Sequence, residues 1–220
     1  MTLPDRFPET RDALHAVAEH VLAAARYQAA GRIGLEVTEG GFATPPFGDD
    51  GRVLAVIGTE LVAGDGGRAP LTTLRAAGEL AGITPGAPAD VYTPATPLDL
   101  DTPLAVDDEA ARRLAAWFSL GDAALREFAV AIAGDDPSPI TLWPEHFDLG
   151  TRAAAVNYGV SPGDEQVEAP YLYVGPDAPD PADEFWNQSF GATATWNEIR
   201  SVPDAVAFFT EGRRHALGPA

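Results

Sequence analysis

The chain has 220 residues, no cysteine, and a net charge of −19 that comes from 33 acidic and 14 basic residues. The lack of cysteine excludes disulfides, thiolate metal sites and a cysteine nucleophile. Every basic residue is an arginine, which also excludes Schiff-base chemistry on a lysine and the lysine of a phosphate-binding P-loop. The negative field disfavours nucleic acid and anionic membranes as partners. The acidity is typical either of compositional bias or of a salt-adapted surface.

A hydrophobic fraction of 45% is enough to build a folded core, so we predict one domain over residues 1–220. No run approaches the roughly 18 apolar residues that would span a bilayer. The first residues lack both the charged and the apolar regions of a secretion signal. These features predict a soluble, cytoplasmic protein.

The first half begins with a predicted helix over residues 8–30, which Gly31 ends. The two histidines of this helix, His15 and His20, are predicted at solvated positions. Strands are expected at residues 33–37 and 53–57, and a short helix from Pro70 to Gly82. Residues 84–103 hold five prolines, which predicts an extended crossover without helix or inner strand.

The second half begins with a long helix that Asp107 caps and that runs to about residue 133. Gly121 and Asp122 are expected to kink or split this helix, because glycine weakens a helix interior. Strands are predicted at residues 140–149, 153–160, 169–174 and in the later part of 186–196, followed by a last helix from Ser201.

The two halves, residues 8–100 and 105–216, have the same order of elements and a few aligned identities at an offset of about 107 residues. Each half alone is too thin to bury its apolar face. We therefore predict an α+β fold in which two pseudo-repeated helix–strands–helix halves join into one antiparallel sheet covered by helices.

Short motifs along the chain resemble a family of uncharacterised, mainly bacterial proteins known only as a domain of unknown function. In the second half they are Ser138-Pro-Ile140, Phe147-Asp-Leu149, Ser161-Pro-Gly-Asp-Glu165, Ala169-Pro-Tyr-Leu-Tyr173, Phe185-Trp186 and Trp196-Asn-Glu198. In the first half they are Leu14-His15 and Arg32-Ile-Gly-Leu35. The resemblance implies the extent of the domain and no activity.

The candidate site is the stretch 140–149, where Pro144 predicts a bulge at a sheet edge. The bulge would bury Ile140, Leu142, Phe147 and Leu149. His146 and Asp148 would then point together to the other face, about 7 Å apart. Such a pair suits a divalent metal or a general base, with a third group from Glu145, Asp164, Glu165 or Glu168. The alternative is a purely structural strand, in which His146 hydrogen-bonds locally at the sheet edge.

Two functions follow, and the sequence leaves open whether the protein is an enzyme. The first is a non-enzymatic binding or protein-interaction domain, with a small molecule or a protein as partner, no required cofactor, and an apolar face that could form a homodimer. Its aromatic-lined pocket or surface would use Trp143, Tyr158, Glu168, Tyr171, Tyr173, Trp186 and Trp196. The second is a metal-assisted hydrolase centred on His146 and Asp148, with Asp164 as a further metal ligand.

Overall fold

The computed structural model describes residues 3–64 and 66–218, and it divides into two compact units. The first unit consists of Met1–Ala116 with Leu142–Phe147, and the second of Trp117–Thr141 with Asp148–Ala220. The predicted single domain over residues 1–220 and the predicted repeat stay predictions.

One helical run opens the first unit, as predicted for residues 8–30. It consists of α1 (Phe7–Val17), the π-helical turn η1 (Ala18–Ala23) and α2 (Ala24–Ala30). Gly31 ends the run with a left-handed φ of 65°, a conformation that glycine adopts at no steric cost. A π-helical turn inside an α-helix is rare and is often found at functional sites.

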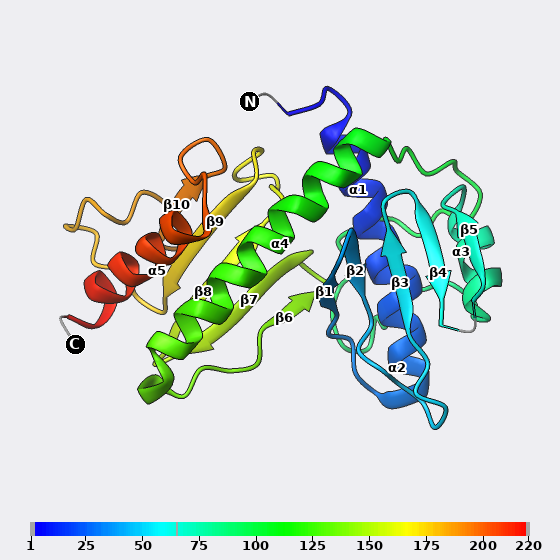
Figure 1. Ribbon diagram of the computed structural model, residues 1–220, viewed down its shortest axis with the longest axis horizontal. Helices are drawn as coiled ribbons and strands as arrows, with labels where there is room; N and C mark the ends of the chain where they lie inside the picture. The colour runs from blue at the N-terminus through cyan, green and yellow to red at the C-terminus, as the bar shows by residue number, and fades with distance from the viewer. Residues whose placement is uncertain (1–2, 65, 219–220) are drawn as a thin grey trace. The chain divides into compact units, whose positions relative to one another are not determined.

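The first sheet is an antiparallel meander in the order β1-β2-β3-β4-β5. Its strands are β1 (Glu36–Thr38), β2 (Gly41–Ala43), β3 (Leu54–Ile57), β4 (Glu60–Ala63) and β5 (Arg68–Pro70). Figure 1 shows β2, β3 and β4 beside the blue helical run. The helix α3 (Leu74–Ala81) follows, with a Thr73 cap and a left-handed Gly82 at its end.

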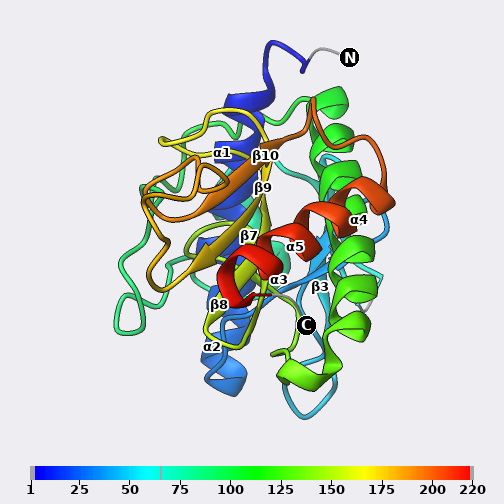
Figure 2. The same ribbon diagram turned by 90° about the vertical axis from the view of Figure 1, so that its left-hand side faces the viewer.

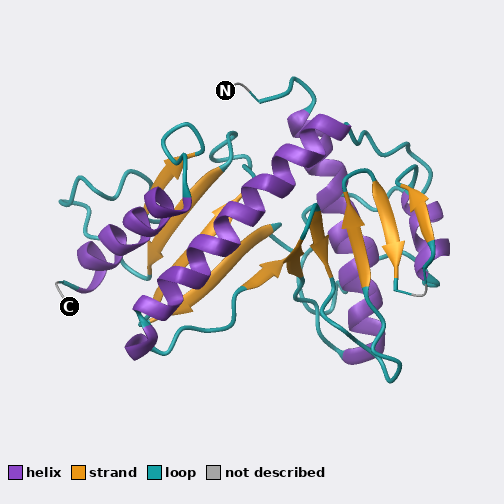
Figure 3. Cartoon of the chain, in the orientation of Figure 1, coloured by secondary structure: helices purple, strands orange, loops and turns teal. Residues whose placement is uncertain are grey.

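The segment between α3 and the next helix contains neither helix nor strand, as its prolines predicted, and Figure 3 shows it as a long loop. Asp107 then caps the next helix, because its Oδ1 accepts a hydrogen bond from the backbone N–H of Ala110 at 3.0 Å.

The helix α4 (Asp108–Ala131) is continuous, so the prediction that it splits at Gly121 and Asp122 is wrong. Gly121 allows α4 to pack closely against Val160, because a Cβ atom at this position would lie 2.4 Å from Cγ2 of Val160. The missing side chain lets the helix approach the second sheet closely. A short 3-10 turn, η2 (Ala133–Asp135), follows α4.

The second sheet is antiparallel in the order β10-β9-β8-β7-β6. Its strands are β6 (Thr141–Trp143), β7 (Asp148–Ala153), β8 (Val156–Ser161), β9 (Tyr171–Pro176) and β10 (Ala192–Thr195). The last helix is α5 (Val202–Leu217), where Gly212 packs on Val174 as Gly121 does on Val160. Figure 2 shows α4 and α5 on the same side of these strands.

The protein therefore has an α+β fold, as predicted. The expected single sheet is replaced by two five-stranded sheets. No helix in residues 3–64 and 66–218 is both long and apolar enough to cross a membrane.

Candidate functional site

The stretch 140–149 forms a tight turn where we expected a one-residue bulge. Residues 144–147 make the turn, and Phe147 adopts a positive φ of 51°. Three of the four expected apolar residues are buried, Leu142, Phe147 and Leu149, whereas Ile140 is half-buried. His146 lies on the turn and is exposed. His146 is therefore a turn residue, and the orientation that we expected from a bulged strand does not apply to it.

Asp148 belongs instead to a cluster of tyrosines and carboxylates in the second unit. The Tyr173 hydroxyl donates to Oδ2 of Asp148, and the Tyr171 hydroxyl donates to Oδ2 of Asp164 at 2.5 Å. The two rings lie 6.2 Å apart. Burial, together with the neighbouring carboxylates, raises the pKa of both phenols, so both remain donors across the physiological range. The structure thus brings four predicted residues together, but as a hydrogen-bonded cluster.

The same cluster weakens the metal hypothesis. Asp164 also accepts hydrogen bonds from the backbone N–H groups of Gln166 and Val167, at 2.7 and 2.9 Å. Across the described part of the chain, no three histidine, aspartate or glutamate residues are grouped so that they could hold a metal ion. No observation favours a metal-assisted hydrolase.

The remaining predicted ligand residues are dispersed. Trp143 and Glu168 are exposed, and Trp186 and Trp196 are half-buried. Tyr158 is fully buried, with its ring 4.7 Å from Phe128. None of these residues lines the cavity described next.

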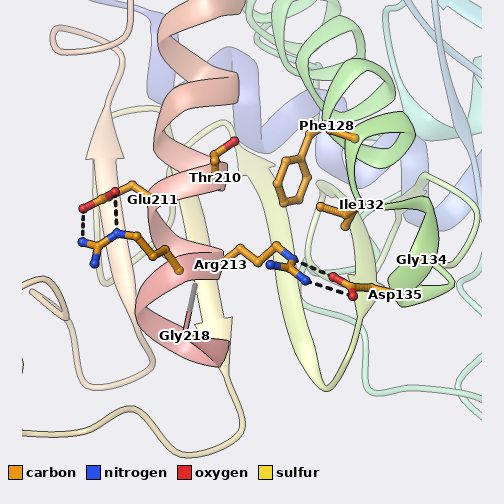
Figure 4. Close-up of a pocket in the computed structure, with 10 residues that line it drawn as sticks. Phe128, Ile132, Gly134, Asp135, Thr210, Glu211, Arg213 and Gly218 are labelled. Carbon is orange, nitrogen blue, oxygen red and sulfur yellow. Dashed lines mark hydrogen bonds and ion pairs between the residues drawn. The ribbon is translucent and has the colours of Figure 1, made fainter. Parts of the chain in front are cut away.

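A cavity of about 420 Å³ lies between the end of α4 and α5 in the second unit. Figure 4 shows Phe128 of α4 and Ile132, the residue that follows this helix, on one side and Arg213 of α5 on the other. The full lining is Phe128, Ala131, Ile132, Gly134, Asp135, Thr210, Glu211, Arg213, Arg214 and Gly218. Cavities of this size accept small organic molecules.

Two arginine–carboxylate pairs stand at this cavity (Figure 4). Arg213 binds Asp135 through two hydrogen bonds of 2.6 and 3.0 Å, and both side chains are only 19% exposed. Arg214 binds Glu211 in the same way, at 3.0 and 2.5 Å, with both side chains about half exposed. These bonds lower the pKa of Asp135 and lower that of Glu211 to about 2. Neither carboxylate is a base suited to neutral pH.

Tyr158 is buried next to one lining residue of the cavity, with its ring 4.7 Å from that of Phe128. Its hydroxyl is buried and has no hydrogen-bond partner among the described residues. Burial raises the pKa of Tyr158 to about 12, and the charges of Arg213 and Asp135 act on it in opposite directions. The hydroxyl is therefore neutral at physiological pH.

A second buried polar cluster, in the first unit, was missed by the sequence analysis. Glu19 and His20 on the π-helical turn are 0% and 1% exposed, so the expectation of solvated histidines is wrong for His20. The Glu19 carboxylate accepts three hydrogen bonds, from the Ala95 N–H, the Thr96 N–H and the Thr96 hydroxyl. The only available signal was the nearly continuous apolar run around these residues, which is typical of a helix buried on all sides.

His20 holds the same proline-rich segment as a neutral imidazole. The Ala87 N–H donates to its Nδ1 at 3.0 Å, so Nδ1 carries no proton. Nε2 then donates to the Thr96 carbonyl at 3.0 Å. Together Glu19 and His20 supply hydrogen-bond partners for backbone groups of this segment, which has no helix or strand to pair them.

His15 is also largely buried, with 15% of its side chain exposed, which corrects its predicted solvated position. Its Nε2 donates to the Pro144 carbonyl at 2.8 Å, and its ring stacks on Phe147 with centroids 5.2 Å apart. Burial lowers the pKa of His15, and the nearby Glu19 carboxylate opposes this effect only in part. The ring is therefore neutral at pH 7.

This lowered pKa makes stability depend on pH. The unfolded state protonates His15 near pH 6.5, above the folded-state pKa, so stability is complete above about pH 6.5 and falls as the pH drops below it. We expect His15→Gln, which keeps a donor for Pro144, to lose less stability between pH 7 and 5 than the parent. The difference should reach at most about 1.4 kcal/mol per pH unit in urea unfolding. His146→Gln, at the exposed histidine, is the control, and equal acid sensitivity of all three proteins would contradict the assignment.

Comparison with family models, curated proteins and solved structures gives no match for this chain. The resemblance seen in the sequence therefore stays a prediction.

Proposed function

We propose that the protein is a non-enzymatic binding protein and that its second unit takes up a small organic molecule in the α4–α5 cavity. The proposal rests on the cavity itself, which has Phe128 and Ile132 on one side and arginine–carboxylate pairs on the other. An apolar surface with a few placed polar groups is the usual composition of a ligand site.

The residues that line the cavity favour ligand binding over catalysis. No histidine lines the cavity, and both carboxylates are held as anions by arginines. The Thr210 hydroxyl donates to the Val206 carbonyl at 2.8 Å, so no neighbouring base activates it as a nucleophile. This arrangement favours the binding hypothesis over an enzyme at this position.

The two ion pairs suggest the chemistry of the ligand. The Arg213–Asp135 pair is mostly buried and is costly to break, whereas the half-exposed Arg214–Glu211 pair contributes little to stability. A ligand carboxylate can therefore replace Glu211 on Arg214 at small cost. We infer a carboxylic acid with an apolar body that contacts Phe128 and Ile132.

The test is a panel of aromatic and medium-chain carboxylic acids, measured by thermal shift and titration calorimetry. A compound at 100 times its Kd should stabilise the protein by about 2.7 kcal/mol. Ala131→Trp would fill the cavity and abolish the effect. Val130→Trp, at the neighbouring residue that is 79% exposed, should bind as the parent does. Absence of binding across the panel, or unchanged binding by Ala131→Trp, would refute the site.

A further inference from the structure

His215 of α5 lies next to the Arg214–Glu211 pair and shares the carboxylate of that pair. Its Nε2 atom is 2.9 Å from Nη2 of Arg214 and 3.1 Å from Oε1 of Glu211. The same Nη2 atom donates to Oε1 at 2.5 Å. One guanidinium nitrogen, one carboxylate oxygen and one ring nitrogen thus form a triangle. The bond that Nε2 makes in it depends on whether this nitrogen carries a proton.

Asp183 determines which nitrogen of the neutral His215 ring carries the proton. Nδ1 of His215 lies 2.5 Å from Oδ2 of Asp183. The backbone N–H of Phe185 and the His215 ring both bind the Asp183 carboxylate and lower its pKa, so the carboxylate stays ionised and can only accept. Nδ1 is therefore a donor, and Nε2 is the nitrogen that gains a proton when the ring becomes charged.

The His215 ring is held in place but stays accessible to protons from solvent. The Phe185 ring stacks on it, with centroids 4.3 Å apart and planes 7° from parallel. The Trp186 ring meets it edge-on, with centroids 6.2 Å apart. The His215 side chain is 20% exposed, so it can exchange protons without leaving these contacts. A change in its charge therefore acts on the groups that already surround it.

The neutral and the charged ring favour different partners. In the neutral ring, Nε2 accepts from Nη2 of Arg214 and makes no hydrogen bond to Glu211, because both of those atoms are then acceptors. In the charged ring, Nε2 donates to Oε1 of Glu211 and the imidazolium repels the guanidinium of Arg214. The charged groups that contact the ring are these two from α5 and Asp183 from the loop between β9 and β10. Protonation therefore exchanges Arg214 for Glu211 as the partner of Nε2.

We propose that His215 controls ligand binding through Arg214: its protonation draws the Glu211 carboxylate to Nε2 and leaves the Arg214 guanidinium for the carboxylate of the ligand. The inference rests on the proposed function, because the ligand is the carboxylic acid of the α4–α5 cavity. His215 does not line this cavity, so it acts as a positioning residue. The ligand then replaces Glu211 without leaving that anion unpaired.

The affinity for a carboxylic acid should rise as the pH falls. Hydrogen bonds from Arg214 and His215 lower the pKa of Glu211 to about 2, so Glu211 remains an anion at neutral and mildly acidic pH. The carboxylic acid is also ionised above about pH 5.5. Between about pH 8 and about pH 5.5, histidine is the only side-chain type among these groups that usually gains a proton. The added positive charge therefore favours the bound ligand.

The experiment measures the Kd of octanoate and of the tightest acid of the panel by titration calorimetry, at about pH 8 and about pH 5.5. We expect the parent to bind roughly tenfold more tightly at the lower pH, a common size for the coupling between two sites. His215→Gln keeps a polar side chain that does not titrate, and it should bind equally at both pH values. His146→Gln, at the exposed histidine of the first unit, should keep the full pH dependence.

The protein without ligand gives a second readout that does not depend on the panel. Nε of Arg214 donates to Oε2 of Glu211 at 3.0 Å. The NMR signal of this N–H group should shift between the two pH values in the parent and stay in place in His215→Gln. If His215→Gln does not fold, Asp183→Asn serves instead, since it keeps an oxygen for the Phe185 N–H and removes the charge that stabilises the imidazolium. In that variant the rise in affinity should move to lower pH.

The outcomes separate this inference from the proposed function. Equal affinity of the parent at both pH values, a pH dependence that His215→Gln retains, or an Arg214 signal that does not shift would overturn the role of His215 and leave the cavity site standing. Absence of binding at both pH values would refute the cavity site and, with it, this inference.

Discussion

Replacing Gly121 by valine is expected to destabilise the protein by about 3 kcal/mol. A Cβ atom at Gly121 would lie 2.4 to 2.9 Å from three side-chain atoms of Val160, and the valine methyl groups would reach further into the sheet. The helix must then move away from β8 and open the core between them. Urea unfolding, followed by circular dichroism, measures the loss.

Two further variants show that the loss comes from this contact. Ala123→Val, at an exposed position of α4, reports the cost of a β-branched residue in the helix and should lose well under 1 kcal/mol. Adding Val160→Ala to Gly121→Val should restore part of the stability, because the colliding methyl groups are removed. Equal losses for Gly121→Val and Ala123→Val would show that the close approach of α4 to the sheet is unimportant.

Replacing Glu19 by glutamine is expected to cost about 3 kcal/mol, through the buried cluster of the first unit. The carboxylate accepts hydrogen bonds from two backbone N–H groups and from the Thr96 hydroxyl. A glutamine of the same shape offers one oxygen and turns an NH₂ group toward the other donors. The proline-rich segment then loses part of its attachment to the helix, and the hydrogen bonds of His20 remain in full.

Glu9→Gln, at an exposed position in the first turn of α1, is the matched control and should cost only a few tenths of a kcal/mol. Hydrogen exchange gives a second measurement, because the Ala95 and Thr96 amides should exchange much faster in Glu19→Gln. Equal stability of the two variants with unchanged exchange would show that the carboxylate does not hold this segment.

The helix ends were predictable because their signals are local. Gly31 and Gly82 adopt left-handed φ angles of 65° and 63°, and Asp107 and Ser201 accept cap hydrogen bonds, as their positions predicted. Gly121 is a glycine too, but its role is different from that of a helix end. It leaves room for the Val160 side chain, a contact that no local sequence pattern reveals.

The sites were less predictable, because residue type alone does not report burial or distant partners. Glu19 and His20 are polar, and only their partners in residues 87–96 explain why they are buried. The cavity combines Phe128 with Arg213, 85 positions apart, so its existence depends on how the end of α4 and α5 lie next to each other. The short distance in sequence between His146 and Asp148 suggested a site, whereas Asp148 is bonded to Tyr173.

The central claim is that the α4–α5 cavity binds a small carboxylic acid, and methyl NMR tests it most directly. The Ile132 methyl groups lie at the cavity, whereas Ile199 is equally buried in the same unit and does not line it. Titration with the tightest compound of the panel should shift the Ile132 signal to saturation and leave the Ile199 signal unchanged. An unchanged Ile132 signal at saturating compound, or equal shifts of both signals, would contradict the claim.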